Sequence, residues 1–267
     1  MLIMNSREKL SSEKIFFGLR EVININEIVK GTFLVEISSS AQLSKSEPGQ
    51  FVYIIPKTQK RTILPRPLCI ADADADTVKL IFKVKGKGTL YLSGLSKGDK
   101  ISVMGPLGKG FQAVKEPVLL AGGGLGAAPL YFLAKKLRNN EKTSLVLGFK
   151  NKDEAYFINE FKSVLRNVFV CTDDGSLGSR GNVTGKIGEI IRDEKIICAC
   201  GPRPMLKSLS AFAGENKMRI FVSLEERMGC GMGACLGCVV KIRAGGKEEY
   251  QRVCKEGPVF DGLKVVF

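Results

Sequence analysis

The chain contains no histidine, and this absence removes several kinds of catalytic and metal site at once. Histidine-activated serine or cysteine nucleophiles, histidine-ligated zinc and histidine-ligated haem are all excluded. The sequence also lacks an apolar run long enough to cross a bilayer, and its first residues lack the apolar core of a signal peptide. We therefore expect a cytoplasmic protein with no membrane partner, whose chemistry comes from cofactors or from Cys, Lys, Arg, Asp and Glu.

Acidic residues are few relative to basic ones. The 41 Lys and Arg against 27 Asp and Glu give a formal net charge of +14. The basic residues are spread along the chain with acids between them, as in KKLRNNEK, which is typical of a solvated surface. An acidic protein partner and the attraction of nucleotide phosphates remain alternatives, and we expect no nucleic-acid partner.

The length of 267 residues suffices for two ordinary domains and a small third one. In residues 1–112, short alternating segments such as GTFLVEIS and QFVYIIP predict an antiparallel β-barrel. In residues 113–223, apolar strands alternate with helical stretches such as APLYFLAKKLRN, which predicts an α/β domain with a parallel sheet. Residues 224–267 are Gly- and Cys-rich and too few for a core of their own, so we expect a metal to hold this small domain together.

Half of the eight cysteines stand in this last segment. Cys230, Cys235 and Cys238 have four and then two residues between them, and Cys254 follows after fifteen more. This is the spacing of plant-type [2Fe–2S] ferredoxins, and the glycines of the loop allow the backbone to fold closely around inorganic sulfide. Zinc and inert buried thiols are the alternatives. Zinc sites favour CxxC pairs or Cys/His mixtures, whereas this chain offers one CxxC and no histidine.

A glycine-rich loop follows the strand expected at Pro117–Ala121. The loop, GGGLGA, satisfies G-x-G-x-x-A and precedes a helix expected from Pro129, so its amides could hold a pyrophosphate. Its predicted contacts are Gly122, Gly123, Gly124 and Gly126. Glycine turns also join strand to helix in proteins that bind no nucleotide, and the next strand ends in GFKNK without an acidic residue for a ribose. Two later strand ends contribute further candidates: Asp174, and the run Cys200, Gly201 and Pro202.

Three short segments of the expected barrel have parts suited to binding a diphosphate. Arg66 is fixed between prolines, an apolar strand ends at Lys83, and Gly88 and Thr89 form a turn at the start of a helix. Each of these, taken alone, could equally be an ordinary surface arginine or hairpin turn.

The order of the motifs carries more information than any one of them. The chain resembles the ferredoxin reductase superfamily in the order of its motifs, which are Arg-Pro-x-x, Gly-Thr, Gly105-Pro-Leu-Gly108, the GGGLGAAPL loop and Cys-Gly-Pro-x-x-Met. The segments Arg227–Cys238 and Val253–Phe260 narrow the resemblance to the electron-transfer subunits of class 1B dihydroorotate dehydrogenase. It runs from about residue 15 to the C-terminus.

The resemblance implies FAD in the barrel, NAD in the sheet domain, and a [2Fe–2S] cluster on the four C-terminal cysteines. It also implies a separate FMN-containing dihydroorotate dehydrogenase catalytic subunit as partner, in an α2β2 heterotetramer. By position, the flavin contacts would be Arg66, Pro67, Leu68, Cys69, Ile81, Phe82, Lys83, Gly88 and Thr89. Two residues depart from the family pattern: Cys69 stands where Ser is usual, and Lys83 stands where Arg is expected.

The function implied is an electron relay of pyrimidine biosynthesis, from the partner's FMN through the cluster and FAD to NAD⁺, with NADH preferred to NADPH. An alternative of the same fold is a subunit of a sulfide dehydrogenase or NADH-dependent ferredoxin:NADP⁺ oxidoreductase. Those relatives tend to have Asp at the first cluster position, where this chain has Cys230. An alternative of another class is a cluster-bearing redox sensor without turnover.

Overall fold

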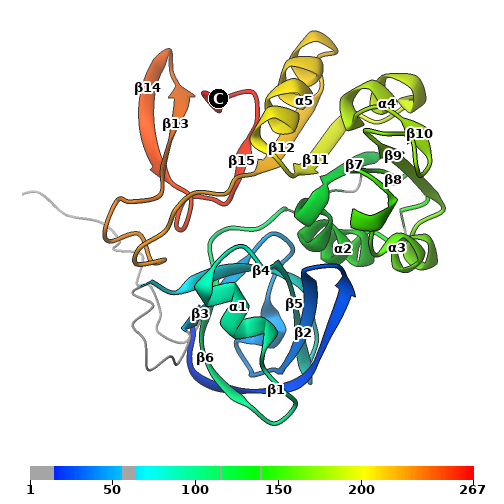
Figure 1. The fold of residues 1–267 in the computed structure, drawn as a ribbon. Helices are drawn as coiled ribbons and strands as arrows, with labels where there is room; N and C mark the ends of the chain where they lie inside the picture. Colours follow the sequence, from blue (N-terminus) through cyan, green and yellow to red (C-terminus); the bar gives the residue numbers. More distant parts are fainter. Residues whose placement is uncertain (1–14, 56–63, 113, 115, 139) are drawn as a thin grey trace, which may run out of the picture.

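The computed structural model describes residues 15–55, 64–112, 114, 116–138 and 140–267. It consists of a barrel, an α/β domain and a smaller C-terminal unit that lies beside both (Figure 1). Residues 1–14 and 56–63 of the expected barrel domain lie outside the described residues.

The barrel is closed and antiparallel, with strand order β1-β2-β5-β4-β3-β6 and β6 returning to pair with β1. Its strands are β1 (Phe16–Val29), β2 (Thr32–Ser38), β3 (Phe51–Ile55), β4 (Arg66–Ala73), β5 (Thr77–Lys83) and β6 (Lys100–Leu107). Alternate side chains such as Ile37, Ile54 and Val103 fill the interior, because successive residues of a strand point to opposite faces. The predicted barrel is confirmed. A turn, η1 (Leu43–Lys45), precedes β3, and the short helix α1 (Lys87–Ser93) joins β5 to β6.

The second domain is built on a sheet of order β10-β9-β8-β7-β11-β12-β15. The strands from its own segment are β7 (Val118–Gly123), β8 (Ser144–Phe149), β9 (Asn167–Thr172), β10 (Ser179–Arg180), β11 (Ile196–Cys200) and β12 (Arg219–Ser223). These pair in parallel, and every residue of β7 and β11 is buried, as expected for strands covered on both faces. The predicted parallel sheet is confirmed.

Helices cover both faces of this sheet. They are α2 (Ala127–Lys136), α3 (Ile158–Val164), α4 (Val183–Ile190) and α5 (Arg203–Glu215), with short turns η2 (Gly124–Gly126) and η3 (Lys152–Glu154). Helices α2 and α3 share one core and α4 and α5 the other, and α2 also packs against β4 of the barrel. The helical turn after β7 begins at Gly124 and α2 at Ala127, slightly earlier than the start expected at Pro129.

The C-terminal segment is tied to its neighbours by protein contacts as well as by any metal. A hairpin of β13 (Val239–Ala244) and β14 (Lys247–Arg252) follows the cysteine loop, and β15 (Val259–Asp261) then adds to the second domain's sheet, antiparallel to β12. Val253 and Phe260 belong to the same apolar core as residues of α5 and β12. This shared core gives shape to a segment too short for a core of its own.

Within the described ranges, no helix is long and apolar enough to cross a membrane.

Candidate functional site

The Arg66 side chain lies directly over the start of helix α1. Its Nη1 donates a hydrogen bond to the carbonyl of Leu64 at 2.7 Å. A Cβ at Gly88 would lie 2.8 Å from Arg66 Nη2, so glycine is needed to leave room for the guanidinium. The structure thus brings together two predicted residues from separate motifs. A fixed guanidinium beside the first backbone N–H groups of a helix is a suitable donor set for a diphosphate.

Thr89 fixes the turn that leads into this helix. Its hydroxyl accepts hydrogen bonds from the backbone N–H groups of Lys85 and Gly86, at 2.9 and 3.2 Å. These hydrogen bonds hold the turn in the geometry that places Gly88 against Arg66. Thr89 therefore stabilises the turn, in addition to the binding role predicted for it.

Two of the predicted flavin contacts place their side chains inside the barrel. Leu68 and Phe82 belong to the barrel core, and the ring of Phe82 stacks on Phe33 with 5.7 Å between ring centroids. Only backbone groups of these two residues remain for a ligand. Pro67 and Cys69 alternate with Leu68 along β4 and lie on the other face of the strand.

Ile81 and Lys83, on one face of β5, meet the second domain. Ile81 is buried in a core that includes α2, and Lys83 Nζ donates to Oε1 of Glu154 in η3 at 3.0 Å. Both charged side chains are 35% exposed, so this ion pair contributes at most about 1 kcal/mol. Lys83 therefore serves as a contact between domains, a role that its place in the sequence did not indicate.

The predicted nucleotide loop packs against the loop that follows β11. A Cβ at Gly126 would overlap the carbonyl of Cys200, and one at Gly201 would lie 3.0 Å from the backbone N of Gly123. The strands β7 and β11 are neighbours at which the strand order reverses, the usual ligand position in an open α/β sheet.

Further contacts at this loop also require small residues. A Cβ at Gly123 would lie 2.8 Å from Cδ of Pro202, and one at Gly122 would lie 3.0 Å from the Leu147 side chain. The carbonyl of Gly124 accepts a hydrogen bond from the Tyr156 hydroxyl at 3.1 Å.

A second group of residues comes from both the barrel and the sheet. The Glu225 carboxylate, just after β12, lies close enough to Cys69 on β4 and Cys200 at the end of β11 to raise the pKa of both thiols. Withdrawal from water and the Glu225 carboxylate together raise the pKa of the half-buried Cys69 thiol to about 12. Burial and the same neighbours raise the pKa of Cys200 as well. Both thiols are neutral at pH 7, so each can donate a weak S–H hydrogen bond.

Glu225 was missed by the reading of the sequence. The signal that could have found it is its place directly after a parallel strand, at the carboxyl edge where ligands of such sheets bind. Tyr156 was missed for a different reason, because it reaches Gly124 from a loop distant in sequence and carries no local pattern.

Asp174 lies at the same edge of the sheet, in the turn after β9. Its Oδ1 accepts hydrogen bonds from the hydroxyl and the backbone N–H of Ser176, at 2.6 and 2.9 Å, and these bonds lower the pKa of the carboxyl. The aspartate is therefore charged at neutral pH. Strand β8 separates β9 from β7, so Asp174 stands apart from the glycine loop.

The four C-terminal cysteines fall into two pairs. The backbone N–H of Cys235 donates to Cys230 Sγ, and that of Cys254 donates to Cys238 Sγ. Among the described residues, no three potential ligands gather around one point as a single metal ion would require. Two pairs of thiols from a glycine-rich loop suit a two-iron cluster with two thiolates on each iron better than they suit zinc.

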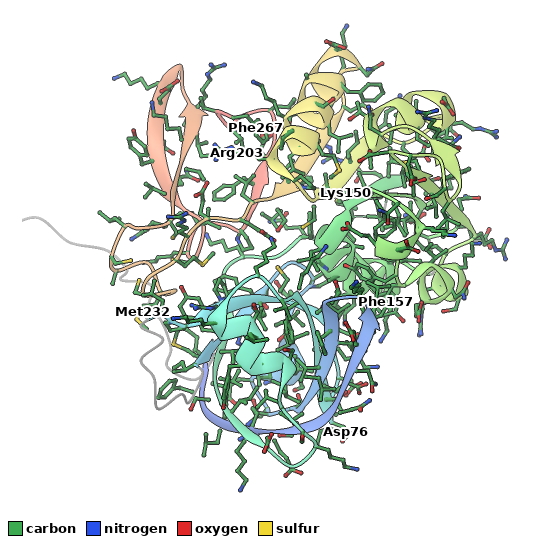
Figure 2. The ribbon with its side chains drawn as sticks, viewed as in Figure 1. Asp76, Lys150, Phe157, Arg203, Met232 and Phe267 are labelled. Atoms are coloured by element: carbon green, nitrogen blue, oxygen red, sulfur yellow. The ribbon has the colours of Figure 1, made fainter. Side chains whose placement is uncertain are left out.

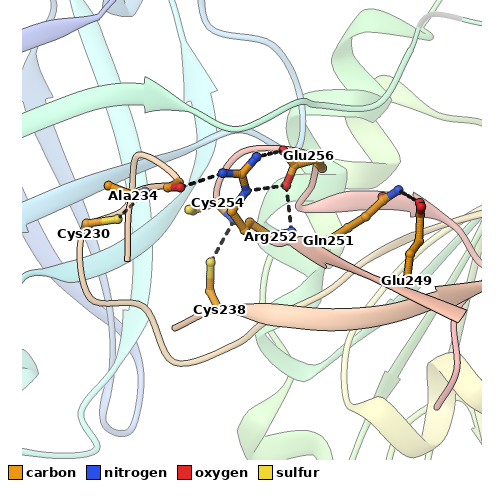
Figure 3. Close-up of polar contacts among 9 residues, drawn as sticks. Cys230, Ala234, Cys238, Glu249, Gln251, Arg252, Cys254 and Glu256 are labelled. Carbon is orange, nitrogen blue, oxygen red and sulfur yellow. Dashed lines mark hydrogen bonds and ion pairs between the residues drawn. The ribbon is translucent and has the colours of Figure 1, made fainter. Parts of the chain in front are cut away.

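Backbone N–H groups already point at the sulfur atoms (Figure 3). Ala234 and Cys235 donate to Cys230 Sγ at 3.2 and 3.4 Å, and Cys254 donates to Cys238 Sγ at 3.4 Å. Partial burial opposes ionisation of Cys230, but these N–H groups prevail and lower its pKa to about 6. Burial and the neighbouring Cys238 raise the pKa of Cys254 to about 12. The donors suit a thiolate ligand, and the donor set fits the iron–sulfur cluster expected from the spacing.

Arg252 anchors the cysteine loop to the end of the hairpin. Its Nη1 donates to the carbonyl of Gly233 at 2.7 Å, while its other nitrogens form a two-pronged ion pair with Glu256 (Figure 3). The hydrogen bonds from Arg252 lower the pKa of Glu256 to about 2. The ion pair therefore persists at any physiological pH and keeps the guanidinium aimed at the loop.

The barrel reaches the cysteine loop through Tyr53 of β3. A Cβ at Gly231 would overlap the ring of this tyrosine, and Gly231 has φ of 72°, so no other residue fits easily there. Burial and the four cysteines together raise the pKa of Tyr53. In the strand pairing, Tyr53 stands opposite Pro67 of the predicted flavin segment.

On its outer side the cysteine loop presents apolar side chains. Met232 and Leu236 are 55% and 61% exposed, and Figure 2 shows Met232 at the edge of the molecule. Cys235 is itself exposed between them. Large exposed apolar side chains beside a redox site are typical of a protein interface.

Comparison with known proteins identifies relatives along nearly the whole chain. Residues 225–266 match the family described as the iron-sulfur cluster binding domain of dihydroorotate dehydrogenase B. The dihydroorotate dehydrogenase B (NAD(+)) electron transfer subunit of Shouchella clausii is 38% identical over 256 residues, covering 93% of this chain and 98% of the relative. The subunit of the same name from Caldanaerobacter subterraneus is 41% identical, covering 84% of this chain and 88% of the relative.

Solved structures agree on the fold. That of an NADH-dependent reduced ferredoxin-NADP oxidoreductase superposes with a TM-score of 0.82 at 33% identity, covering 93% of this chain and 90% of that one. The ferredoxin reductase of carbazole 1,9a-dioxygenase, at 16% identity and a TM-score of 0.65, shares the fold over 76% of this chain and 67% of its own. The expected ferredoxin-reductase architecture and the C-terminal cluster domain are confirmed. With identity near 40% over almost its full length to subunits of one name, the chain belongs to the family of dihydroorotate dehydrogenase B electron transfer subunits.

Proposed function

We propose that this chain, in the cytoplasm, carries electrons from the FMN of a dihydroorotate dehydrogenase catalytic subunit to NAD⁺. The observation that carries the proposal is the central position of the segment Arg66–Cys69. On the nucleotide side of this segment, Cys69 lies near Cys200 and Glu225, beside the nucleotide loop. On the cluster side, Pro67 pairs with Tyr53, and Tyr53 contacts the cysteine loop. A flavin held by this segment would lie between the nicotinamide and the cluster.

The chain's own residues would bind and orient the cofactors. Arg66 and the Gly88 amide would hold the FAD diphosphate, while the loops after β7 and β11 would hold the dinucleotide pyrophosphate. When bound, FAD exchanges single electrons with a [2Fe–2S] cluster and a hydride with nicotinamide, which no side chain of this protein can do. The protein supplies position, exclusion of water and adjustment of potential.

Cys69, Cys200 and Glu225 would orient the nicotinamide against the flavin. Neutral thiols of Cys69 and Cys200 can donate weakly to flavin or carboxamide acceptors, and Glu225 can accept from the carboxamide amine. A thiol at position 69 donates more weakly than the serine usual in the family, so Cys69 would adjust the flavin's potential without changing the hydride path.

The exposed loop around the cluster would face the catalytic subunit. Met232 and Leu236 surround Cys235 with apolar surface, and docking there would bring the partner's FMN near the cluster. We propose an assembly of two such chains with two catalytic subunits, which the mass of the purified complex would test.

Cys230→Ser tests the relay. A serine oxygen is a harder ligand than thiolate, so the variant should lose or weaken the cluster while it keeps FAD and reduces dyes with NADH. Mixed with the catalytic subunit, it should no longer couple dihydroorotate oxidation to NAD⁺ reduction, although dihydroorotate should still reduce the partner's FMN. Cys171→Ser is the matched control, because Cys171 is buried in β9 away from the loop and already bonds the Leu147 carbonyl. Normal NAD⁺ reduction by a cluster-free variant would contradict the proposed order.

A second candidate comes from the similarity to the NADH-dependent reduced ferredoxin-NADP oxidoreductase at 33% identity. The two candidate functions differ in electron donor, which is the catalytic subunit's FMN in the first and reduced ferredoxin in the second. Reduction of NADP⁺ by reduced ferredoxin with no response to dihydroorotate would favour this second candidate. The presence of Cys230, where Asp is expected in that group, supports the first.

A further inference from the structure

Tyr53 is the point at which the barrel touches the cysteine loop. It lies in the middle of β3, opposite Pro67 on β4, and its ring presses against the backbone of Gly231. Its ring also meets Phe51 edge to face, with 6.0 Å between centroids. These contacts fix the ring from two sides, so the direction of the hydroxyl is set by the fold and not by free rotation of the side chain.

The hydroxyl of Tyr53 is buried and lacks a partner. The residue is 1% exposed, and in the described part of the chain its oxygen makes no hydrogen bond. Leaving a buried hydroxyl unpaired costs about 1–3 kcal/mol, so tyrosines in such positions normally have an acceptor. The ring carbon that bears this hydroxyl lies against Gly231, the residue that follows Cys230, so the hydroxyl lies at the loop that carries the cysteines. No acceptor for this hydroxyl is present among the described residues, and a cluster held by the cysteine loop would bring negatively charged sulfur to it.

We propose that the Tyr53 hydroxyl donates a hydrogen bond to a sulfur atom of the [2Fe–2S] cluster or of a cysteine that holds it. This inference rests on the proposed function only in requiring the cluster. The reduced cluster carries one more negative charge than the oxidised cluster, so a donated hydrogen bond stabilises the reduced form more and raises the reduction potential. Backbone N–H groups give the same effect from within the loop, whereas Tyr53 gives it from the barrel.

The position of Tyr53 links this adjustment to the flavin side of the relay. The same residue contacts the cluster loop through its ring and pairs with the flavin segment through its strand. The proposed hydrogen bond would therefore join the cluster loop to the strand that pairs with the flavin segment.

Tyr53→Phe tests the assignment, because phenylalanine keeps the ring and its packing on Gly231 but removes the hydroxyl. FAD, iron and acid-labile sulfide contents should be unchanged. At a fixed potential the ratio of reduced to oxidised cluster should fall about tenfold, a negative midpoint shift of about 59 mV for one electron, measured by EPR-monitored titration. Tyr250→Phe is the matched control, since Tyr250 lies on the same small domain with 66% of its surface exposed, and its midpoint should not move.

Two spectroscopic readouts separate a hydrogen bond from a packing effect. In D₂O, pulsed EPR of the reduced protein should show a deuteron coupling that is absent from Tyr53→Phe and present in Tyr250→Phe. If Tyr53→Phe fails to hold its cluster, the unmodified sequence is labelled with 3-fluorotyrosine, whose more acidic phenol is a stronger donor and should raise the midpoint.

The outcomes are distinguishable. An unchanged midpoint in Tyr53→Phe, or in the fluorotyrosine protein, would overturn the assignment of Tyr53 while leaving the relay intact. A protein without any [2Fe–2S] signal in its unmodified form would instead overturn the proposed function.

Discussion

Lys135 of α2 donates to the carboxylate of Asp72 on β4 across 2.5 Å, at the boundary between the two larger domains. The Asp72 side chain is 7% exposed, and its other oxygen has no hydrogen-bond partner among the residues that the structure describes. The lysine therefore provides the partner without which this buried carboxylate would be an uncompensated charge. Because β4 begins at Arg66 and α2 follows the glycine loop, the pair joins the elements that carry the predicted flavin and nucleotide segments.

Lys135→Met should lower both stability and electron transfer from NADH. The change leaves a buried carboxylate without its partner, which should reduce the free energy of unfolding by about 1–3 kcal/mol, since one side of the pair is partly exposed. The rate of NADH-dependent dye reduction should fall while the FAD content stays normal. Urea unfolding and stopped-flow reduction would measure the two effects. Lys136→Met is the control, because Lys136 is exposed and pairs with no acid in the described chain. Equal stability and equal rates of dye reduction in the two variants would refute the positioning role of Lys135.

Gly88→Ala should weaken FAD binding without unfolding the barrel. The new Cβ would collide with the Arg66 guanidinium and displace it from the start of α1. Losing one charge-assisted hydrogen bond of about 1.5–3 kcal/mol would raise the Kd for FAD by about one to two decades, measured by flavin fluorescence. Gly86→Ala provides the comparison, because a Cβ there meets nothing within 4 Å. Similar FAD affinity in both variants would move the diphosphate site elsewhere, as would full retention of FAD by Arg66→Ala.

Glu256→Gln should loosen the cluster loop in a pH-dependent way. The hydrogen bonds from Arg252 lower the pKa of Glu256 from 4.5 to about 2, so their stabilisation is present above about pH 4.5 and disappears as pH falls through about 2. At pH 7 the variant should lose its cluster to a chelator about two- to fivefold faster than the unmodified protein. In acid-jump experiments followed by visible absorbance, this difference should shrink between pH 4.5 and 2. Glu249→Gln, whose carboxylate bonds only Gln251 in the described chain, should show no such difference at any pH.

NADH should be preferred to NADPH, and Asp174 should contribute to the preference. Hydrogen bonds from Ser176 keep this carboxylate charged and fixed at the ligand-binding edge of the sheet, where it would repel a 2′-phosphate. Replacement by Asn should reduce the ratio of kcat/KM for NADH over NADPH by about tenfold, since a single exposed charge is partly screened by salt. Lys150 and Lys152 follow β8, and their positive charges would favour the 2′-phosphate of NADPH. Figure 2 shows Lys150 beside the sheet. A protein that prefers NADPH before any substitution would refute the prediction.

The sequence by itself determined the elements, and it also predicts the cluster ligands. Cysteine spacing is a local property, because a tight loop needs its thiolates at fixed intervals, and so Cys230, Cys235, Cys238 and Cys254 are predicted as ligands without knowledge of the fold. Strand alternation and the strand–glycine–helix pattern are local for the same reason, and they predicted both domain architectures correctly.

Only the tertiary structure decided which residues meet. Gly88 lies against Arg66, Lys83 reaches Glu154 and Tyr53 presses on Gly231, and each pair joins elements distant along the chain. Pairing of β15 with β12 also joins the C-terminal segment to the sheet. Such contacts depend on how barrel, sheet and hairpin pack, which no short sequence pattern encodes. For the same reason Leu68 and Phe82, read as flavin contacts from their order in the chain, place their side chains in the barrel core.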